Sequence, residues 1–179
     1  ILAKRINELL KDKDVDGIVI THGTDTMEET AYFLNLVVNS DKPVVLVGAM
    51  RPSTAISADG PRNLYNAVVT AAAPESRGKG VLVVMNDNIL GAESVTKMNT
   101  TNVQTFQAPN AGPLGYVFNS KVFYNQEPLK KHTTASVFDV TNLDKLPKVG
   151  IVYSHAGVNA DMVEPMLKND YQGIIHAGV

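Results

Sequence analysis

Three short runs of apolar and mostly β-branched residues divide the first half of the chain. They are residues 17–20, 44–47 and 81–85, and each interval between them carries the apolar spacing of an amphipathic helix. Short apolar runs of this kind are typical of strands buried on both faces of a sheet. Because a strand–helix–strand–helix–strand order requires right-handed crossovers, we predict an α/β fold with a doubly wound, mostly parallel sheet.

Later segments predict a β-hairpin and the beginning of a second domain. Residues 116–118 and 122–124 are apolar runs around a short polar loop, a pattern typical of a hairpin. We predict an N-terminal α/β domain at 1–125 that carries the active site, a linker at 126–148, and the start of a smaller α/β domain at 149–179. Since the chain starts inside a helical pattern and ends just after an apolar run, we expect both domains to be truncated.

Composition and charge argue against several kinds of protein. The 16 basic and 18 acidic residues give a net charge of −2, which disfavours a general nucleic-acid surface. No apolar run is long enough to span a membrane. The absence of cysteine excludes a thiol nucleophile and a thiolate metal site, and the scattered histidines lack the paired spacing of metal ligands.

The turn after the first apolar run brings a hydroxyl and a carboxylate together in Thr24 and Asp25. In an open α/β sheet such a turn lies at the carboxyl edge of a strand, where ligands bind. Thr26 and Glu29 have the spacing of a capping box, and Glu28 adds negative charge at the start of the next helix. Thr24 and Asp25 are therefore candidate site residues, and the alternative is that they only cap the helix and bond the turn.

Two finer expectations concern the region after the second apolar run. Asp59 is expected to form an ion pair with Arg51 or Arg62, and His22 to bond the backbone of its turn. The helix that begins at Pro61 is expected to bury the apolar face Leu64, Ala67, Val68, Ala71 and Ala72.

Four segments resemble the bacterial L-asparaginases, the threonine amidohydrolases that cleave asparagine and often glutamine. The segments are Thr21–Thr26 (THGTDT), Pro43–Met50 (PVVLVGAM), Arg51–Pro61 (RPSTAISADGP) and Gly80–Thr101, which ends in VTKMNTT. They occur in the same order as in that family and cover nearly the whole chain, so the signal is far more specific than a lone glycine loop.

The resemblance implies hydrolysis of the side-chain amide of L-asparagine, and also of L-glutamine, by threonine-based acyl-enzyme chemistry. The implied catalytic residues are Thr24, Asp25 and Lys97, and the implied substrate-binding residues are Gly23, Thr24, Asp25 and Ala49. In that scheme Asp25 takes the α-ammonium of the substrate and the carbonyl of Ala49 accepts from the substrate amide. By its spacing alone Lys97 would be an ordinary surface lysine.

The resemblance also implies no metal or organic cofactor, and a homotetramer whose sites are shared between subunits. It is nearest to the secreted type, which indicates the periplasm, with the cytoplasm as the alternative. One family motif, the N-terminal TGGT-type segment that supplies the usual first nucleophile, has no counterpart in these residues. We therefore expect residues 1–179 by themselves not to turn over asparagine.

Two other functions stay open. One is a flavodoxin-like phosphate- or nucleotide-binding module, which the negative charge of Asp25 and the absence of a phosphate-loop motif disfavour. The other is an asparaginase-like subunit of a tRNA-dependent amidotransferase. Ammonia release from free asparagine would separate the hydrolase from both.

Overall fold

The computed structural model describes residues 1–178, so Val179, the last residue of the predicted second domain, lies outside the described part. The chain forms two compact units, Ile1–Val140 and Thr141–Val179. The division after Val140 falls inside the segment predicted as a linker. The exact domain boundaries stay a prediction.

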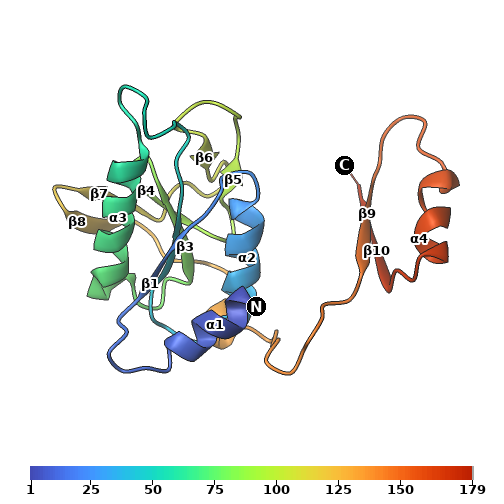
Figure 1. Cartoon of the computed structure of the whole chain (residues 1–179), viewed down its shortest axis with the longest axis horizontal. Helices are drawn as coiled ribbons and strands as arrows, with labels where there is room; N and C mark the ends of the chain where they lie inside the picture. Colours follow the sequence, from blue (N-terminus) through green and yellow to red (C-terminus); the bar gives the residue numbers. More distant parts are fainter. Residues whose placement is uncertain (179) are drawn as a thin grey trace. The chain divides into compact units, whose positions relative to one another are not determined.

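The first unit is built around a six-stranded sheet with the order β1-β2-β3-β4-β7-β8 (Figure 1). Its strands are β1 (Ile18–Thr21), β2 (Val44–Val47), β3 (Val81–Met85), β4 (Asn88–Gly91), β7 (Gly115–Phe118) and β8 (Lys121–Tyr124). Its helices are α1 (Leu2–Leu9), α2 (Met27–Val37) and α3 (Gly60–Ala72), with the short 3-10 helices η1 (Pro74–Ser76) and η2 (Thr133–Ala135). A separate two-stranded ladder joins β5 (Thr96–Lys97) to β6 (Phe106–Gln107).

Strands β1, β2 and β3 are parallel, and helices α2 and α3 lie on opposite sides of the sheet (Figure 1). Every residue of β2 and β3 is buried, because helices cover both faces of these strands. The predicted α/β fold is therefore confirmed. Strands β4, β7 and β8 then extend the sheet in antiparallel pairs.

Strand β1 is less buried than its sequence predicts. Its three apolar residues are only half-buried and Thr21 is exposed. Within residues 1–178, β1 stands at the end of the sheet and pairs with β2 only. The prediction of burial on both faces was therefore wrong for this strand, because a strand with one neighbour keeps an open side.

Helix α3 buries only part of the apolar face that its spacing predicts: Ala67 and Ala71 are buried, whereas Ala72 is exposed. Leu64 and Val68 are 43% and 52% exposed, although both were expected in the core. The buried residues are Asn63, Asn66, Ala67, Thr70 and Ala71. The polar members of this face satisfy their hydrogen-bonding groups inside the molecule, so the helix can bury amides and leave apolar side chains in solvent.

Two hairpins use residues with left-handed backbone conformation at their turns. Asn86 and Asp87 have φ of 50° and 65° between β3 and β4, and Asn119 and Ser120 have φ of 48° and 60° between β7 and β8. Pairs of this kind form the tight turns that match the twist of antiparallel strands. The hairpin formed by β7 and β8 was predicted, whereas no strand was predicted at β4.

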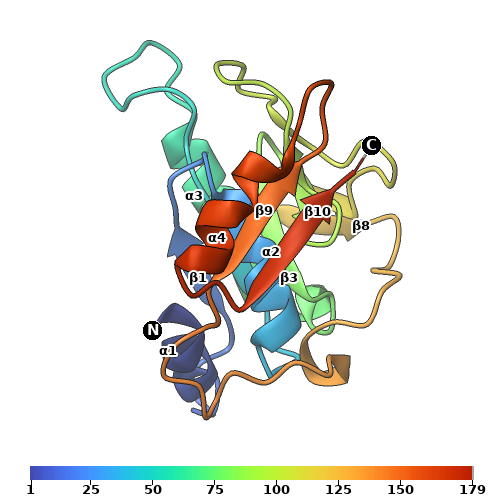
Figure 2. The same ribbon diagram turned by 90° about the vertical axis from the view of Figure 1, so that its right-hand side faces the viewer.

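The second unit contains two parallel strands, β9 (Val149–Tyr153) and β10 (Gly173–Ala177). Between them lie the 3-10 helix η3 (Ala160–Met162) and helix α4 (Glu164–Lys168), and α4 lies beside the two strands (Figure 2). Two strands with a helix between them are the elements that the start of an α/β domain requires. Pro165 sits in the first turn of α4, where its missing N–H costs no helical hydrogen bond.

Candidate active site

The turn between β1 and α2 carries the two predicted residues Thr24 and Asp25. It follows the carboxyl end of a parallel strand, which is the edge where α/β proteins bind ligands. Helix α2 begins at Met27 with Thr26 at its N-cap, but the Thr26 side chain makes no capping hydrogen bond. The expected capping box is therefore absent, and α2 begins with the backbone geometry alone.

Lys97 reaches this turn from strand β5. Its Nζ donates hydrogen bonds to Thr24 Oγ1 at 2.9 Å and to Asp25 Oδ1 at 2.5 Å. The Lys97 side chain is 14% exposed, whereas that of Asp25 is 93% exposed. The structure thus brings the three predicted catalytic residues together, with the amine covered and the carboxylate open to a ligand.

The electrostatics of the cluster favour an ionised Asp25. The hydrogen bond from Lys97 and the charge of the same side chain lower the pKa of Asp25 below its ordinary value. Because the carboxylate is almost fully exposed, solvent screens this pair and it contributes little to folding stability. The effect of the Lys97–Asp25 pair is to hold the negative charge of Asp25 beside the hydroxyl of Thr24.

Glu28, in the first turn of α2, is a site residue that the sequence did not identify. Its Oε2 accepts a hydrogen bond from the backbone N–H of Lys97. The contact fastens β5 to the helix that follows Thr24 and Asp25. Only the charge of Glu28 near a helix start was visible in the sequence, and no spacing rule connects it to Lys97.

His22 stabilises the turn, as expected. Its Nδ1 donates to the carbonyl of Gly23 at 2.6 Å, so this nitrogen carries a proton. Its Nε2 accepts from the hydroxyl of Thr30, 3.0 Å away on α2. Both ring nitrogens are therefore engaged in holding the turn against the helix.

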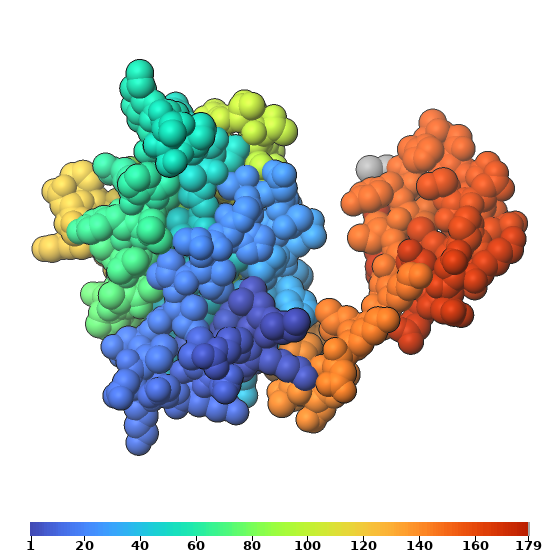
Figure 3. All heavy atoms as spheres, in the orientation of Figure 1, coloured from blue at the N-terminus to red at the C-terminus, as the bar shows by residue number. Residues whose placement is uncertain are grey.

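An open cavity of about 710 Å³ lies at the carboxyl ends of β1 and β2, beside the first turn of α3. Two predicted substrate-binding residues, Gly23 and Ala49, line it, together with His22, Gly48, Ser53 and Leu64. Thr24, Asp25 and Lys97 are not among its lining residues. Beyond Ala49 the loop projects into solvent, with Ile56 almost fully exposed (Figure 3).

Asp59 does not form the ion pair that its neighbours suggested. It accepts hydrogen bonds from the backbone N–H groups of Met50 and Arg51. Arg51 instead donates to the carbonyl of Ser57, and Arg62 pairs with Asp87. The expected ion pair was wrong because the Asp59 carboxylate is bonded by the backbone amides of its own loop instead of by an arginine.

Residues 1–178 hold neither a cluster of metal ligands nor a membrane-spanning helix. No group of three or more His, Cys, Asp or Glu side chains is arranged to hold a metal ion. No helix in the same range has the length and apolar character needed to cross a bilayer.

The parallel strands β1 to β3 have helices on both sides, and a hydroxyl, a carboxylate and an amine meet in the turn at the carboxyl end of β1. This arrangement is that of an α/β protein with its candidate site at the carboxyl edge of the sheet. The chain belongs to the asparaginase family, because residues 1–130 match the family model described as "Asparaginase, N-terminal". This membership confirms the resemblance carried by the THGTDT and VTKMNTT segments.

Individual relatives agree with this family. The chain is 60% identical over 178 residues to "Probable L-asparaginase periplasmic" of Haemophilus influenzae, covering 99% of this chain and 50% of that protein. It is 51% identical over 177 residues to "Glutaminase-asparaginase" of Pseudomonas fluorescens, covering 99% of this chain and 49% of that protein. The chain thus spans about half the length of the curated relatives it matches.

A solved structure is similar over the same range. The crystal structure of "Probable Cytoplasmic L-asparaginase" from Campylobacter jejuni superposes with a TM-score of 0.95 at 53% identity, covering 99% of this chain and 58% of that one. The arrangement of strands and helices is therefore that of an asparaginase.

Proposed function

We propose that the protein hydrolyses the side-chain amide of L-asparagine, and of L-glutamine, to the acid and ammonia. The observation that carries this proposal is the position of Lys97 Nζ, within hydrogen-bonding distance of both Thr24 Oγ1 and Asp25 Oδ1. Membership of the asparaginase family and the names of the relatives support the same reaction.

The proposed course has two stages. A hydroxyl oxygen attacks the amide carbon of the substrate and its proton is transferred to the leaving nitrogen. The C–N bond then breaks, which releases ammonia and leaves a covalent ester. Water then attacks the ester, which releases the acid and restores the hydroxyl. Thr24 activates the nucleophile or the water, and Lys97 moves the protons between them.

Substrate binding completes the proposal. Asp25 anchors the α-ammonium of the substrate, which its exposure and its lowered pKa support. The carbonyl of Ala49, at the edge of the cavity, accepts from the substrate amide, and Gly23 lines the same cavity. The negative charge of Asp25 would repel a phosphate, which weighs against the binding-module alternative.

Ammonia release by the protein encoded by the complete gene tests this function. Release from free L-asparagine, at a rate lost in the Lys97→Met variant, is the expected result. Phosphate or nucleotide binding without ammonia release would overturn the proposal in favour of the binding module. Ammonia production that requires an aminoacylated tRNA and a partner enzyme would favour the amidotransferase subunit.

We also propose a homotetramer with sites shared between subunits and a periplasmic location. One relative is named periplasmic, and the similar solved structure is titled cytoplasmic, so location needs its own test. Fractionation of cells by osmotic shock should release the activity with the periplasmic fraction. Light scattering of the purified protein should give four times the mass of one subunit.

A further inference from the structure

The turn that follows β2 is held by side chains from the first turn of α3. Asp59 Oδ2 accepts from the N–H of Met50 at 2.9 Å, and Asp59 Oδ1 accepts from the N–H of Arg51 at 2.9 Å. Asp59 is the N-cap residue of α3, yet its side chain makes no capping hydrogen bond to that helix. The carboxylate is thus used to hold the backbone of the turn on the C-terminal side of Ala49.

Asn63 holds the other side of the same turn. Its Nδ2 donates to the carbonyl of Gly48 at 3.1 Å and to Asp59 Oδ2 at 3.0 Å. Its Oδ1 accepts from the N–H of Asn86 at 3.0 Å, which fixes the amide in one orientation. Asn63 is 2% exposed, and its three hydrogen bonds are partly buried. The two side chains therefore fix the residues on either side of Ala49.

The turn packs directly against the predicted catalytic residues. A Cβ built on Gly48 would lie 2.8 Å from the carbonyl oxygen of His22 and 3.1 Å from Thr24 Cγ2. A Cβ built on Gly60 would lie 3.2 Å from Ala49 Cβ. Because the spacing is this close on both sides, a shift of the turn would move Ala49 relative to Thr24.

Asp59 is suited to this task by its charge. Partial burial alone would raise the pKa of Asp59, but hydrogen bonds from Met50, Arg51 and Asn63 outweigh it and lower the pKa overall. An ionised carboxylate offers two acceptor oxygens, which is what two neighbouring N–H groups require.

We infer that Asp59 and Asn63 are positioning residues that set the place of the Ala49 carbonyl, and so select amide substrates. The inference rests on the proposed function, in which this carbonyl accepts from the N–H of the substrate amide. An ester has no N–H to donate at that point. Displacing the carbonyl must therefore slow amide hydrolysis more than ester hydrolysis.

The test compares L-asparagine with L-aspartate β-methyl ester in the protein encoded by the complete gene. The Asp59→Asn variant keeps the size of the side chain but replaces one acceptor oxygen by an NH₂ group, which cannot accept from the N–H groups of Met50 and Arg51. We expect kcat/KM for the amide to fall about tenfold more than kcat/KM for the ester. A general loss of folding would lower both rates together.

Asn63→Asp supplies a second, independent measurement. It removes the donor to Gly48 and places a second carboxylate 3.0 Å from Asp59 at the present Nδ2 position. As the pH falls, one proton is shared by the two carboxylates, which removes their repulsion and restores the donor to Asp59, while the donor to Gly48 stays absent. The amide-to-ester ratio of this variant should therefore recover on acidification relative to the wild-type ratio.

Asn66→Asp is the matched control, because Asn66 lies one turn further along the same buried face and donates to Asp87 at 2.8 Å. The same chemical change there should leave the amide-to-ester ratio unchanged. Equal losses for amide and ester in Asp59→Asn, or a pH-independent ratio in Asn63→Asp, would overturn the inference while the hydrolase function stands. A wild-type protein that cleaves neither substrate would overturn both.

Discussion

The backbone N–H of Lys97 donates a hydrogen bond to the carboxylate of Glu28, although the two residues are 69 positions apart in the chain. The side chain of the same lysine meets Thr24 and Asp25, which directly precede the helix of Glu28. The first turn of α2 therefore binds the backbone of Lys97, while the turn before α2 binds the Lys97 amine. This double attachment ties the two-residue strand β5, which also pairs with β6, to the start of α2.

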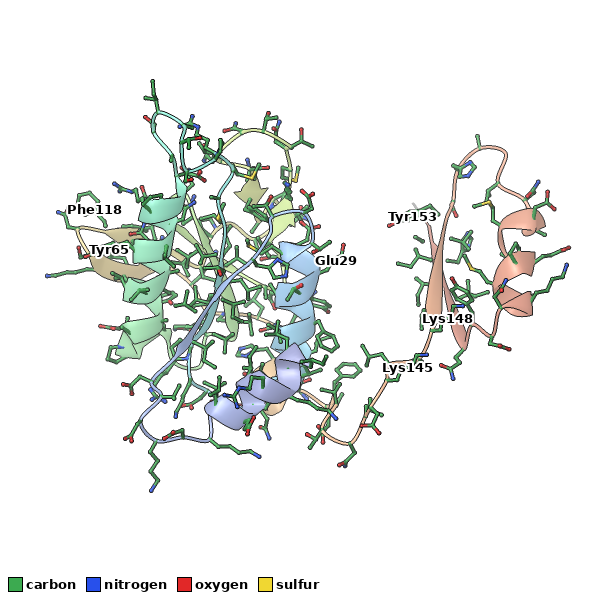
Figure 4. All side chains as sticks on the ribbon, viewed as in Figure 1. Glu29, Tyr65, Phe118, Lys145, Lys148 and Tyr153 are labelled. Atoms are coloured by element: carbon green, nitrogen blue, oxygen red, sulfur yellow. The ribbon has the colours of Figure 1, made fainter. Side chains whose placement is uncertain are left out.

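Removal of Glu28 should weaken catalysis without touching the reacting groups. In Glu28→Ala the β5 backbone loses its anchor, so we expect kcat/KM for asparagine to fall about tenfold through misplacement of Lys97. Steady-state kinetics measure this loss. Glu29 supplies the control, because it carries the same charge in the same helical turn and points into solvent (Figure 4). Equal losses in Glu29→Ala would mean that helix charge, rather than the anchor, is responsible.

The proposed catalytic pair predicts large losses from nearly isosteric changes. Thr24→Val and Lys97→Met should each lower kcat for asparagine by roughly 100-fold or more, because each removes a proton-transfer partner. Thermal unfolding should show that both variants remain folded. Thr24→Ser retains the hydroxyl and should keep more activity than Thr24→Val. Near wild-type turnover in either main variant would remove that residue from the mechanism.

Asp25→Ala should chiefly destroy recognition of the free amino acid. The substrate ammonium would lose its charged partner, so we expect the dissociation constant for asparagine to rise about tenfold or more. Calorimetric titration in a Thr24→Val background measures binding without turnover. Affinity equal to that of Thr24→Val alone would contradict the ammonium-anchor role.

Tyr124 predicts a loss of stability at alkaline pH. Burial raises the pKa of Tyr124 to about 12, and its hydroxyl shares a hydrogen bond with Ser76. The unfolded chain loses this proton near the ordinary tyrosine pKa of 10.0, whereas the folded chain keeps it. Stability should therefore be unaffected by this group below that pH and fall as the pH rises from there toward 12.

Denaturant unfolding of wild type and Tyr124→Phe checks this directly. Between about pH 9 and about pH 11 the wild type should lose roughly 1 kcal/mol more than the variant. Identical pH dependence of the two proteins would show that Tyr124 is not the buried group responsible.

The sequence predicts the central strands of the sheet well because a short run of β-branched apolar residues favours a buried strand over other secondary structure. Val44–Val47 and Val81–Met85 form strands with the predicted bounds. Strand β4 was missed because only two of its four residues, Ile89 and Leu90, carry large apolar side chains, too few to show a period. The Asn86–Asp87 pair is a tight-turn signal that would have indicated a hairpin directly after β3.

Helix α3 shows why apolar spacing can choose the wrong face. Its apolar spacing predicted that Leu64 and Val68 are buried, but both are exposed, and the buried face contains Asn63, Asn66 and Thr70. Asn63 and Asn66 bond Gly48 and Asp87, partners outside the helix that only the tertiary structure supplies, and Thr70 bonds the carbonyl of Asn66 one turn earlier. The contact of Lys97 with Thr24 has the same origin, since the two residues are 73 positions apart and no local spacing rule reveals it.

Strand β1 is an edge strand within residues 1–178, and this affects the behaviour of residues 1–179 as an isolated polypeptide. Along the side away from β2, within the described chain, its peptide groups meet no neighbouring strand, and its isoleucine and valine side chains are half-buried. An edge strand of this kind can pair with a strand from another molecule. Solubility of the isolated polypeptide should therefore be limited by self-association along this edge strand.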